Sequence, residues 1–214
     1  VESTVKRIRN HPSLAYYVAS NESTEVTGTP ELLNKLDGTR GFQMQSECEG
    51  VHDGSPYKQV NPMQHYENTA SPRGSRVDGF NPEYGAPTLP TVEILREMMD
   101  EKDLWPINKE VWDYLDGNGF HLMTTMYTDL VNNYGKSSSI DEFAQKGQLL
   151  GAMNSKSIWE VWNYNKLDYG DRFCSGLLFW YHNCSMRQVS SRMWDWSLEP
   201  TASLYHTANS LEPL

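Results

Sequence analysis

The chain has 214 residues, 38% of them hydrophobic and 12% aromatic, so its length and composition are those of one domain with a sizeable core. Its formal net charge is −10 at pH 7, and its Lys and Arg residues form no cluster, so nucleic acid is not expected as a partner. No run of 18 apolar residues is present, and no membrane partner is expected either.

The first predicted strand covers residues 14–19 (LAYYVA), a short and mostly apolar run that follows the helix stop formed by His11 and Pro12. Glu22 falls just past the C-terminal end of this run. In a (β/α)8 barrel, catalytic residues occupy such positions because the carboxyl ends of the strands converge on one face. The alternative for a single glutamate here is a loop carboxylate or a partner of a helix N-terminus.

The next elements are a helix over residues 30–38 and a strand over residues 41–47. Pro30 suits the first turn of that helix and Gly38 suits its end. Residues 50–79 are rich in Gly, Pro, Ser and Asn, which predicts a long loop. In a (β/α)8 barrel, such a loop would lie over the active-site face. Within this stretch, residues 62–66 (PMQHY) are the best candidate for a further strand.

A second glutamate, Glu83, closes another apolar run in the segment 80–85 (FNPEYG), 61 positions after Glu22. Cleavage of a glycosidic bond with retention uses one carboxylic acid and one carboxylate about 5 Å apart. The two glutamates therefore look like an acid/base and nucleophile pair.

Helical patterns dominate the rest of the chain. The stripe formed by Val92, Leu95, Met98 and Met99 predicts a helix over residues 88–99 with these side chains in the core. Residues 105–135 indicate extra helices, an insertion that we place at about 104–140. Its aromatic residues are interpreted as core, with sugar platforms as the alternative. A helix over residues 149–162 and a strand over residues 176–183 follow.

The three cysteines, Cys48, Cys174 and Cys184, are an odd number without close pairing, so no disulfide framework is expected. A zinc site built from Cys174, His182 and Cys184 matches no common metal motif and lacks an evident fourth ligand. We expect no metal and no organic cofactor.

Several motifs, taken in order, carry a resemblance to a known family. RIRNHPS at residues 7–13 is followed nine positions after Ser13 by Glu22, and PEYGAP at residues 82–87 contains Glu83. Both segments resemble the acid/base and nucleophile segments of family 2 glycoside hydrolases, although Pro82 replaces the usual Ser. Residues 140–149, 176–183 and 202–214 resemble the last crossing helix, last strand and last helix of that family's barrel. The match is nearest to the branch of exo-β-glucosaminidases and β-mannosidases.

This resemblance implies an α/β fold, namely the C-terminal part of a (β/α)8 TIM barrel from about strand 4 to helix 8. A closed barrel needs roughly 250 residues, so residues 1–214 would form a partial catalytic domain. The expected partners are a carbohydrate substrate, the remaining N-terminal barrel strands and the sandwich domains of a parent enzyme. The compartment stays unknown, and the periplasm or extracellular space is plausible for the parent enzyme.

The resemblance also gives roles to individual residues. It makes Glu22 the acid/base and Glu83 the nucleophile. It implies that Asn21 binds the substituent at carbon 2 of the sugar, the alternative being a turn asparagine. It also implies that Tyr66 donates to the nucleophile, the alternative being an exposed loop ring.

The predicted strand over residues 176–183, which would be strand 8 of the barrel, supplies the remaining expected site residues. Trp180 resembles the indole that floors the sugar site, since an aromatic face suits the apolar face of a pyranose; a plain core role is the alternative. His182 and Asn183 follow it and would line the rim.

For the substrate, the family's glucosaminidases usually carry Ser-Asp where this chain has Asn21 and Glu22, which favours a neutral sugar. A terminal β-mannoside is the first expectation, and a β-galactoside or β-glucosaminide the alternative. A different class stays open, in which the chain is a catalytically inactive remnant that binds carbohydrate or serves as a scaffold. We expect weak or no activity from the isolated 214 residues.

Overall fold

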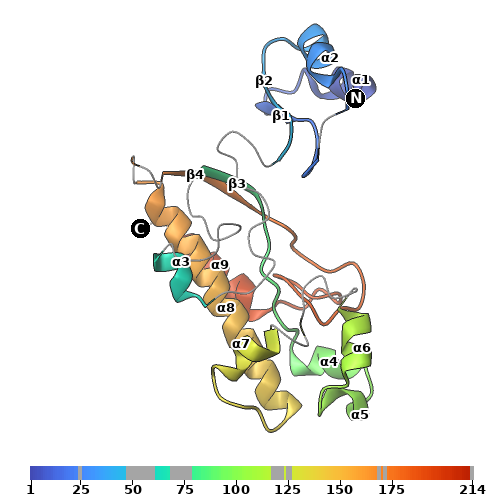
Figure 1. Ribbon diagram of the computed structural model, residues 1–214, viewed down its shortest axis with the longest axis vertical. Helices are drawn as coiled ribbons and strands as arrows, with labels where there is room; N and C mark the ends of the chain where they lie inside the picture. The colour runs from blue at the N-terminus through green and yellow to red at the C-terminus, as the bar shows by residue number, and fades with distance from the viewer. Residues whose placement is uncertain are drawn as a thin grey trace. The chain divides into compact units, whose positions relative to one another are not determined.

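The computed structural model describes residues 1–23, 26–46, 61–67, 79–116, 123, 127–167, 170 and 173–212. The chain divides into two compact units, Val1–Asp53 and Gly54–Leu214, each of which is described by itself. Figure 1 shows the helices and strands with their labels.

The first unit contains two helices and a two-stranded parallel sheet: α1 (Glu2–Ile8), β1 (Tyr16–Val18), α2 (Thr29–Leu36) and β2 (Gly41–Gln43). Tyr17 points from the middle of β1 into a small core with Val5 of α1 and Leu33 of α2. Because side chains alternate along a strand, Tyr16 and Val18 lie on the opposite face, where they are 47% and 52% exposed. The strand predicted over residues 14–19 and the helix predicted over residues 30–38 are confirmed as β1 and α2, each shorter than expected.

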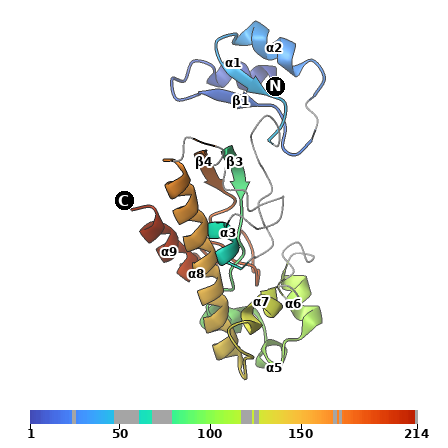
Figure 2. The same cartoon turned by 60° about the vertical axis from the view of Figure 1, so that its left-hand side comes forward.

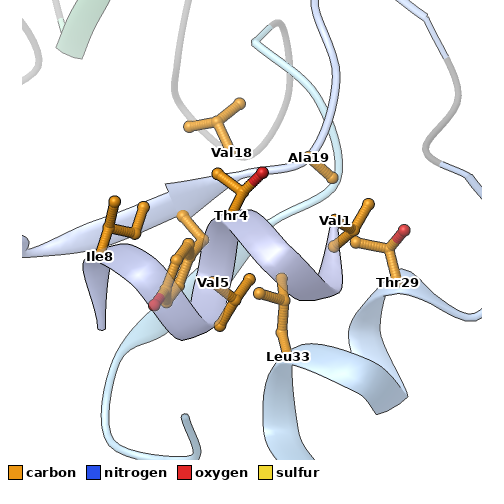
Figure 3. A pocket seen from close by; sticks show the side chains of 9 residues that line it. Val1, Thr4, Val5, Ile8, Val18, Ala19, Thr29 and Leu33 are labelled. Carbon is orange, nitrogen blue, oxygen red and sulfur yellow. The ribbon is translucent and has the colours of Figure 1, made fainter. Parts of the chain in front are cut away.

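A pocket of about 330 Å³ lies between α1, β1 and α2 of the first unit. Its wall is mainly apolar and includes Val5, Ile8 and Leu33, of which Val5 and Leu33 lie next to one another in Figure 3. The small core of this unit therefore leaves space between its two helices.

The second unit is organised around the helix α8 (Ile140–Asn165), which packs on the parallel strands β3 (Gly79–Tyr84) and β4 (Cys174–Phe179) and on α9 (Ala202–Ser210). Figure 2 shows α9 beside α8. Ser139 caps α8 by accepting the N–H of Glu142 at 3.2 Å, while Glu142 accepts the N–H of Ser138 at 2.8 Å. The two helical patterns predicted over residues 140–162 are thus one continuous helix.

The described residues of the second unit also form the helices α3 (Met63–Glu67), α4 (Val92–Met98), α5 (Glu101–Leu104), α6 (Lys109–Leu115) and α7 (Thr128–Asn132). The predicted stripe on α4 is confirmed, since Leu95 and Met98 are buried. The core interpretation holds for Trp112 and Tyr127, whereas Tyr114 is 82% exposed. Phe120 and Met126 lie outside the described residues.

The prediction of a strand at residues 62–66 is wrong, because these residues begin the helix α3. Asn61 starts the helix by accepting the N–H of Met63 on its side-chain oxygen at 3.0 Å, and Pro62 follows at a position where a helix tolerates proline. The short apolar run carried a helix-start signal that the strand interpretation ignored.

None of the helices in the described ranges combines the length and hydropathy that a bilayer crossing requires.

Candidate active site

Glu22 lies where the sequence predicts it, four residues after the end of β1. The end of β2 fixes this turn from the side. Ala19 donates its N–H to the carbonyl of Gln43 at 3.0 Å, and the backbone N–H of Ser46 donates to Ser20 at 3.1 Å. The pairing of β1 with β2 thus continues past both strands and holds the loop that carries Glu22.

Glu22 itself has a left-handed backbone with φ of 48°. A residue other than glycine adopts this conformation at a cost of about 1–2 kcal/mol, and such residues concentrate at functional sites. The backbone N–H of Glu22 donates to Ser46 Oγ at 3.0 Å, and the same hydroxyl lies 3.5 Å from Asn21 Oδ1. Asn21 and Glu22 are therefore anchored to one buried serine.

Glu83 is half-buried and lies inside β3, one residue before its end, rather than just past the strand. In the register of the sheet, Asn81 pairs with Leu177 and Tyr84 pairs with Phe179, so Pro82 and Glu83 together face a single residue of β4. This is a β-bulge, a place where a strand tolerates proline because the ladder is interrupted. The bulge explains how Pro82 can replace the usual serine of this turn.

The side chain of Asn81 stabilises the bulge, since its Oδ1 accepts the backbone N–H of Glu83 at 2.9 Å. Tyr84, the next residue, is fully buried against Ile158, Trp162 and Cys174. Glu83 is thus fixed between a side-chain hydrogen bond on one side and a core aromatic ring on the other.

Trp180 follows β4 and is joined to the strand that carries Glu83, because its backbone N–H donates to the carbonyl of Tyr84 at 2.6 Å. Its indole is 37% exposed and meets the ring of Tyr181 edge to face, with 4.5 Å between the ring centroids. The peptide bond between Trp180 and Tyr181 is cis. The indole is therefore partly exposed next to the strand that carries Glu83.

His182 and Asn183 are exposed and come directly after this segment. The ring of His182 lies edge to face with that of Phe179, 6.3 Å between centroids, and its carbonyl accepts the N–H of Trp194 at 2.9 Å. Asn183 forms an isolated parallel bridge with Trp194. Both residues are therefore held by backbone contacts, with their side chains at the surface.

Tyr66 does not donate to Glu83. It lies on α3, and its hydroxyl, which has one proton to give, donates to Glu160 of α8. Burial, followed by this contact with Glu160, raises the pKa of the Tyr66 phenol. The structure thus groups Glu83 with the segment of Trp180 and His182, and Asn21 with Glu22, and it sets Tyr66 apart.

Two residues of these surroundings escaped the sequence analysis, namely Ser46 and Arg192. Ser46 lies in the predicted strand 41–47, so a search for hydroxyls at the C-terminal end of that strand could have found it. Arg192 is completely buried, and its guanidinium carbon lies 5.9 Å from the ring centre of Trp180. No local pattern signals this arginine.

Within the described ranges, no group of three His, Cys, Asp or Glu side chains is placed to hold a metal ion. Cys174 and Cys184 are both buried and stand outside any disulfide. Cys48 lies outside the described residues.

No family model matches the chain. Among curated proteins, it is 22% identical over 261 residues to a mannosylglycoprotein endo-β-mannosidase of Lilium longiflorum, covering 99% of this chain and 26% of that protein. It is 24% identical over 234 residues to an exo-β-D-glucosaminidase of Amycolatopsis orientalis, covering 99% of this chain and 22% of that protein. The chain spans about a quarter of the length of these relatives.

The chain also resembles solved structures of the same two kinds of enzyme. The exo-chitosanase of Amycolatopsis orientalis superposes with a TM-score of 0.82 at 22% identity, over 100% of this chain and 27% of that one. A β-D-mannosidase of Dictyoglomus thermophilum superposes with a TM-score of 0.74 at 19% identity, over 98% of this chain and 28% of that one. The chain therefore has the mixed α/β fold of a portion of these enzymes, and its resemblance to the exo-β-glucosaminidase and β-mannosidase branch of the family 2 glycoside hydrolases is confirmed.

Proposed function

We propose that the whole protein is a retaining β-glycosidase that removes a terminal sugar by double displacement. In this proposal residues 1–214 form its (β/α)8 barrel from about strand 4 to helix 8, with an insertion at about 104–140. The observation that carries the proposal is that Glu22 and Glu83 each lie at the carboxyl end of a strand in a parallel pair. The relatives named above, which share this fold, act on β-linked sugars by name.

The chemistry divides between the two glutamates. Glu22 donates a proton to the leaving oxygen while Glu83 attacks the anomeric carbon, which forms a glycosyl-enzyme. A water molecule that loses its proton to Glu22 then releases the sugar. This reaction requires neither a metal nor an organic cofactor.

The other site residues bind the sugar in this proposal. Asn21 contacts the substituent at carbon 2, where hydrogen bonds strengthen in the transition state. Trp180 forms the floor, and its partial exposure beside the strand of Glu83 supports that role. His182 and Asn183 line the rim. Tyr66 joins this set only if its hydroxyl exchanges Glu160 for Glu83 or for the substrate.

The open edges of both sheets support a larger assembly. Among the described residues, β1 pairs only with β2 and β3 only with β4. Unpaired strand edges and exposed apolar faces, such as those of Val18 and Leu178, need a cover in a stable protein. Further barrel strands and sandwich domains of the full-length protein would supply it.

For the substrate we propose a terminal β-mannoside, with a β-galactoside or β-glucosaminide as the alternative. The relatives include both mannosidases and glucosaminidases, so their names do not decide. The pair Asn21 and Glu22 in place of Ser-Asp favours the neutral sugar. A carbohydrate-binding or scaffold role without catalysis is the candidate from another class.

The test is covalent labelling of the full-length protein with 2-deoxy-2-fluoro glycosyl fluorides of the manno, galacto and gluco series, read by peptide mass spectrometry. We expect an adduct on Glu83, fastest with the manno reagent, and none in the Glu83→Gln variant. Glu97→Gln, which changes an exposed glutamate on α4, is the matched control and should label as the wild type does. A folded protein that no reagent labels would favour the binding role.

A further inference from the structure

We infer that Arg192 is a positioning residue whose buried guanidinium fixes the segment of Trp180 and Tyr181, and with it the indole at the floor of the sugar site. The inference rests on the proposed function, and it names a determinant of sugar binding that neither the family motifs nor the comparisons supply.

The first argument is the burial of a permanent charge. Arg192 is 0% exposed, although arginine is almost never fully buried unless its charge is compensated. Its Nη1 donates to Ser190 Oγ at 3.0 Å and to the carbonyl of Ser191 at 2.8 Å. Because these bonds are lost if the side chain moves, the guanidinium is held in one place.

The second argument is the contact of this guanidinium with two aromatic rings. Its central carbon lies 4.8 Å from the ring centre of Tyr181 and 5.9 Å from that of Trp180, both within the range of a cation–π interaction. The two rings meet edge to face, so a group that holds both of them restricts the rotamer of each. A planar guanidinium suits this task better than an ammonium group, since it stacks on aromatic faces.

The third argument is the connection to the strand of Glu83. Ser191, the neighbour of Arg192, forms an antiparallel bridge with Thr88, with N–O distances of 3.0 and 2.8 Å. Thr88 lies five positions after Glu83 in the chain. The backbone at Arg192 and the backbone at Trp180 are thus both hydrogen-bonded to the segment that carries Glu83, so the arginine is fixed relative to the nucleophile.

The charge also acts on the groups packed around it. The positive charge of Arg192 works to lower the pKa of Tyr84, Asp116, Tyr181 and Cys184, against the burial that raises each of them. These groups come from β3, from the residue after α6 and from the segment after β4. One guanidinium therefore acts on buried groups from three segments of the second unit.

The consequence for function concerns binding more than bond cleavage. A sugar that stacks on Trp180 gains most when the ring is held in its bound orientation beforehand. Loss of the guanidinium should therefore weaken sugar binding in the ground state and the transition state alike, while the carboxylates keep their chemistry.

The experiment compares Arg192→Met and Arg192→Lys in the full-length protein, with KM and kcat measured on the aryl β-glycoside that the wild type hydrolyses. We expect Arg192→Met to raise KM about tenfold with kcat changed less than threefold, and Arg192→Lys to fall in between. The matched control is Arg187→Met, because Arg187 is exposed and stacks on Trp196 with 4.9 Å to the ring centre. It should leave KM unchanged.

A double-mutant cycle with Trp180→Phe separates positioning from general stability. If Arg192 acts through the indole, Arg192→Met should raise KM far less in the Trp180→Phe background, and its change in the near-ultraviolet circular dichroism should be much smaller there. Ser190→Ala removes one acceptor of the guanidinium with little change of volume. This variant should also raise KM. It tests the inference if both arginine variants fail to fold.

The outcomes are distinct. An unchanged KM in a folded Arg192→Met or Ser190→Ala variant, or full additivity in the cycle, would overturn the inference while the proposed function stands. A wild type that hydrolyses no aryl β-glycoside but shows the coupled spectral change would overturn the proposed function, and with it the role of Arg192 in sugar binding.

Discussion

The hydroxyl of Ser46 accepts a hydrogen bond of 3.0 Å from the backbone N–H of Glu22, so the segment after β2 fixes the turn that follows the neighbouring strand β1. Ser46 is 6% exposed, and its own N–H donates to Ser20 in the same turn. Because Glu22 has a left-handed backbone, an external hydrogen bond helps to hold it there. The orientation of the proposed acid/base thus depends on a residue 24 positions further along the chain.

Ser46→Ala should lower kcat about tenfold in the full-length protein, because the turn of Glu22 loses its anchor and the carboxyl group is less well aligned. The loss of the hydrogen bond should cost about 1 kcal/mol of stability. Steady-state kinetics and denaturant unfolding measure the two effects. Ser3→Ala, at an exposed position of α1, is the control. A variant that loses stability but keeps the wild-type kcat would show that Ser46 has a purely structural role.

Glu22→Ala should reduce kcat about 10²–10⁴-fold on substrates with poor leaving groups, since such groups depend on general acid catalysis. Azide should restore turnover of an activated aryl β-glycoside and give the β-glycosyl azide, because a small anion can attack the glycosyl-enzyme without a general base. Product analysis by mass spectrometry and NMR reads the outcome. Glu31→Ala, an exposed change on α2, should neither lose activity nor respond to azide. If azide does not restore turnover, Glu22 is not the acid/base.

The position of Glu22 could be predicted because it depends on a local pattern, a short apolar run that ends three residues before it. The apolar stripe on α4 could be predicted for the same reason. The prediction at residues 62–66 failed because apolar content in so short a run does not separate strand from helix, and the capping signal of Asn61 decided it.

The bulge at Glu83 and the burial of Arg192 could not be predicted from the sequence. The bulge at Pro82 and Glu83 depends on the register with β4, which lies more than 90 positions further along the chain. The burial of Arg192 depends on Trp180, Tyr181 and the bridge from Ser191 to Thr88. Contacts between distant segments set both features, and no window of sequence contains them.

Gly151→Ala should destabilise the protein by about 1–3 kcal/mol, although alanine is the better helix former by about 1 kcal/mol. A Cβ atom at Gly151 of α8 would lie 1.9 Å from Thr88 Oγ1 and 3.0 Å from Ser203 Oγ, so the helix would have to move away from the segment after Glu83. Thermal unfolding measures the change. Gln145→Ala, at an exposed position of the same helix, should be close to neutral. A Gly151→Ala protein of raised stability would mean that α8 packs less closely on Thr88.

Asp116 should make stability depend on pH between about 4 and 6. Its side chain is 2% exposed, and burial raises the pKa of the carboxyl group from 3.8 to about 6, against the backbone N–H of Met123 and the charge of Arg192, which lower it. The folded state therefore keeps a proton that the unfolded chain releases at lower pH. The contribution of Asp116 to stability is fully present below about pH 4 and decreases as the pH rises to about 6.

Asp116→Asn removes this titration, and its amide oxygen can still accept the N–H of Met123. The difference in unfolding temperature between the variant and the wild type should therefore grow in favour of the variant from pH 4 to pH 6 and stay constant above that. Differential scanning fluorimetry across this range measures it, with Asp129→Asn, an exposed change on α7, as the matched control. A difference that is the same at every pH would mean that Asp116 titrates alike in the folded and unfolded chains.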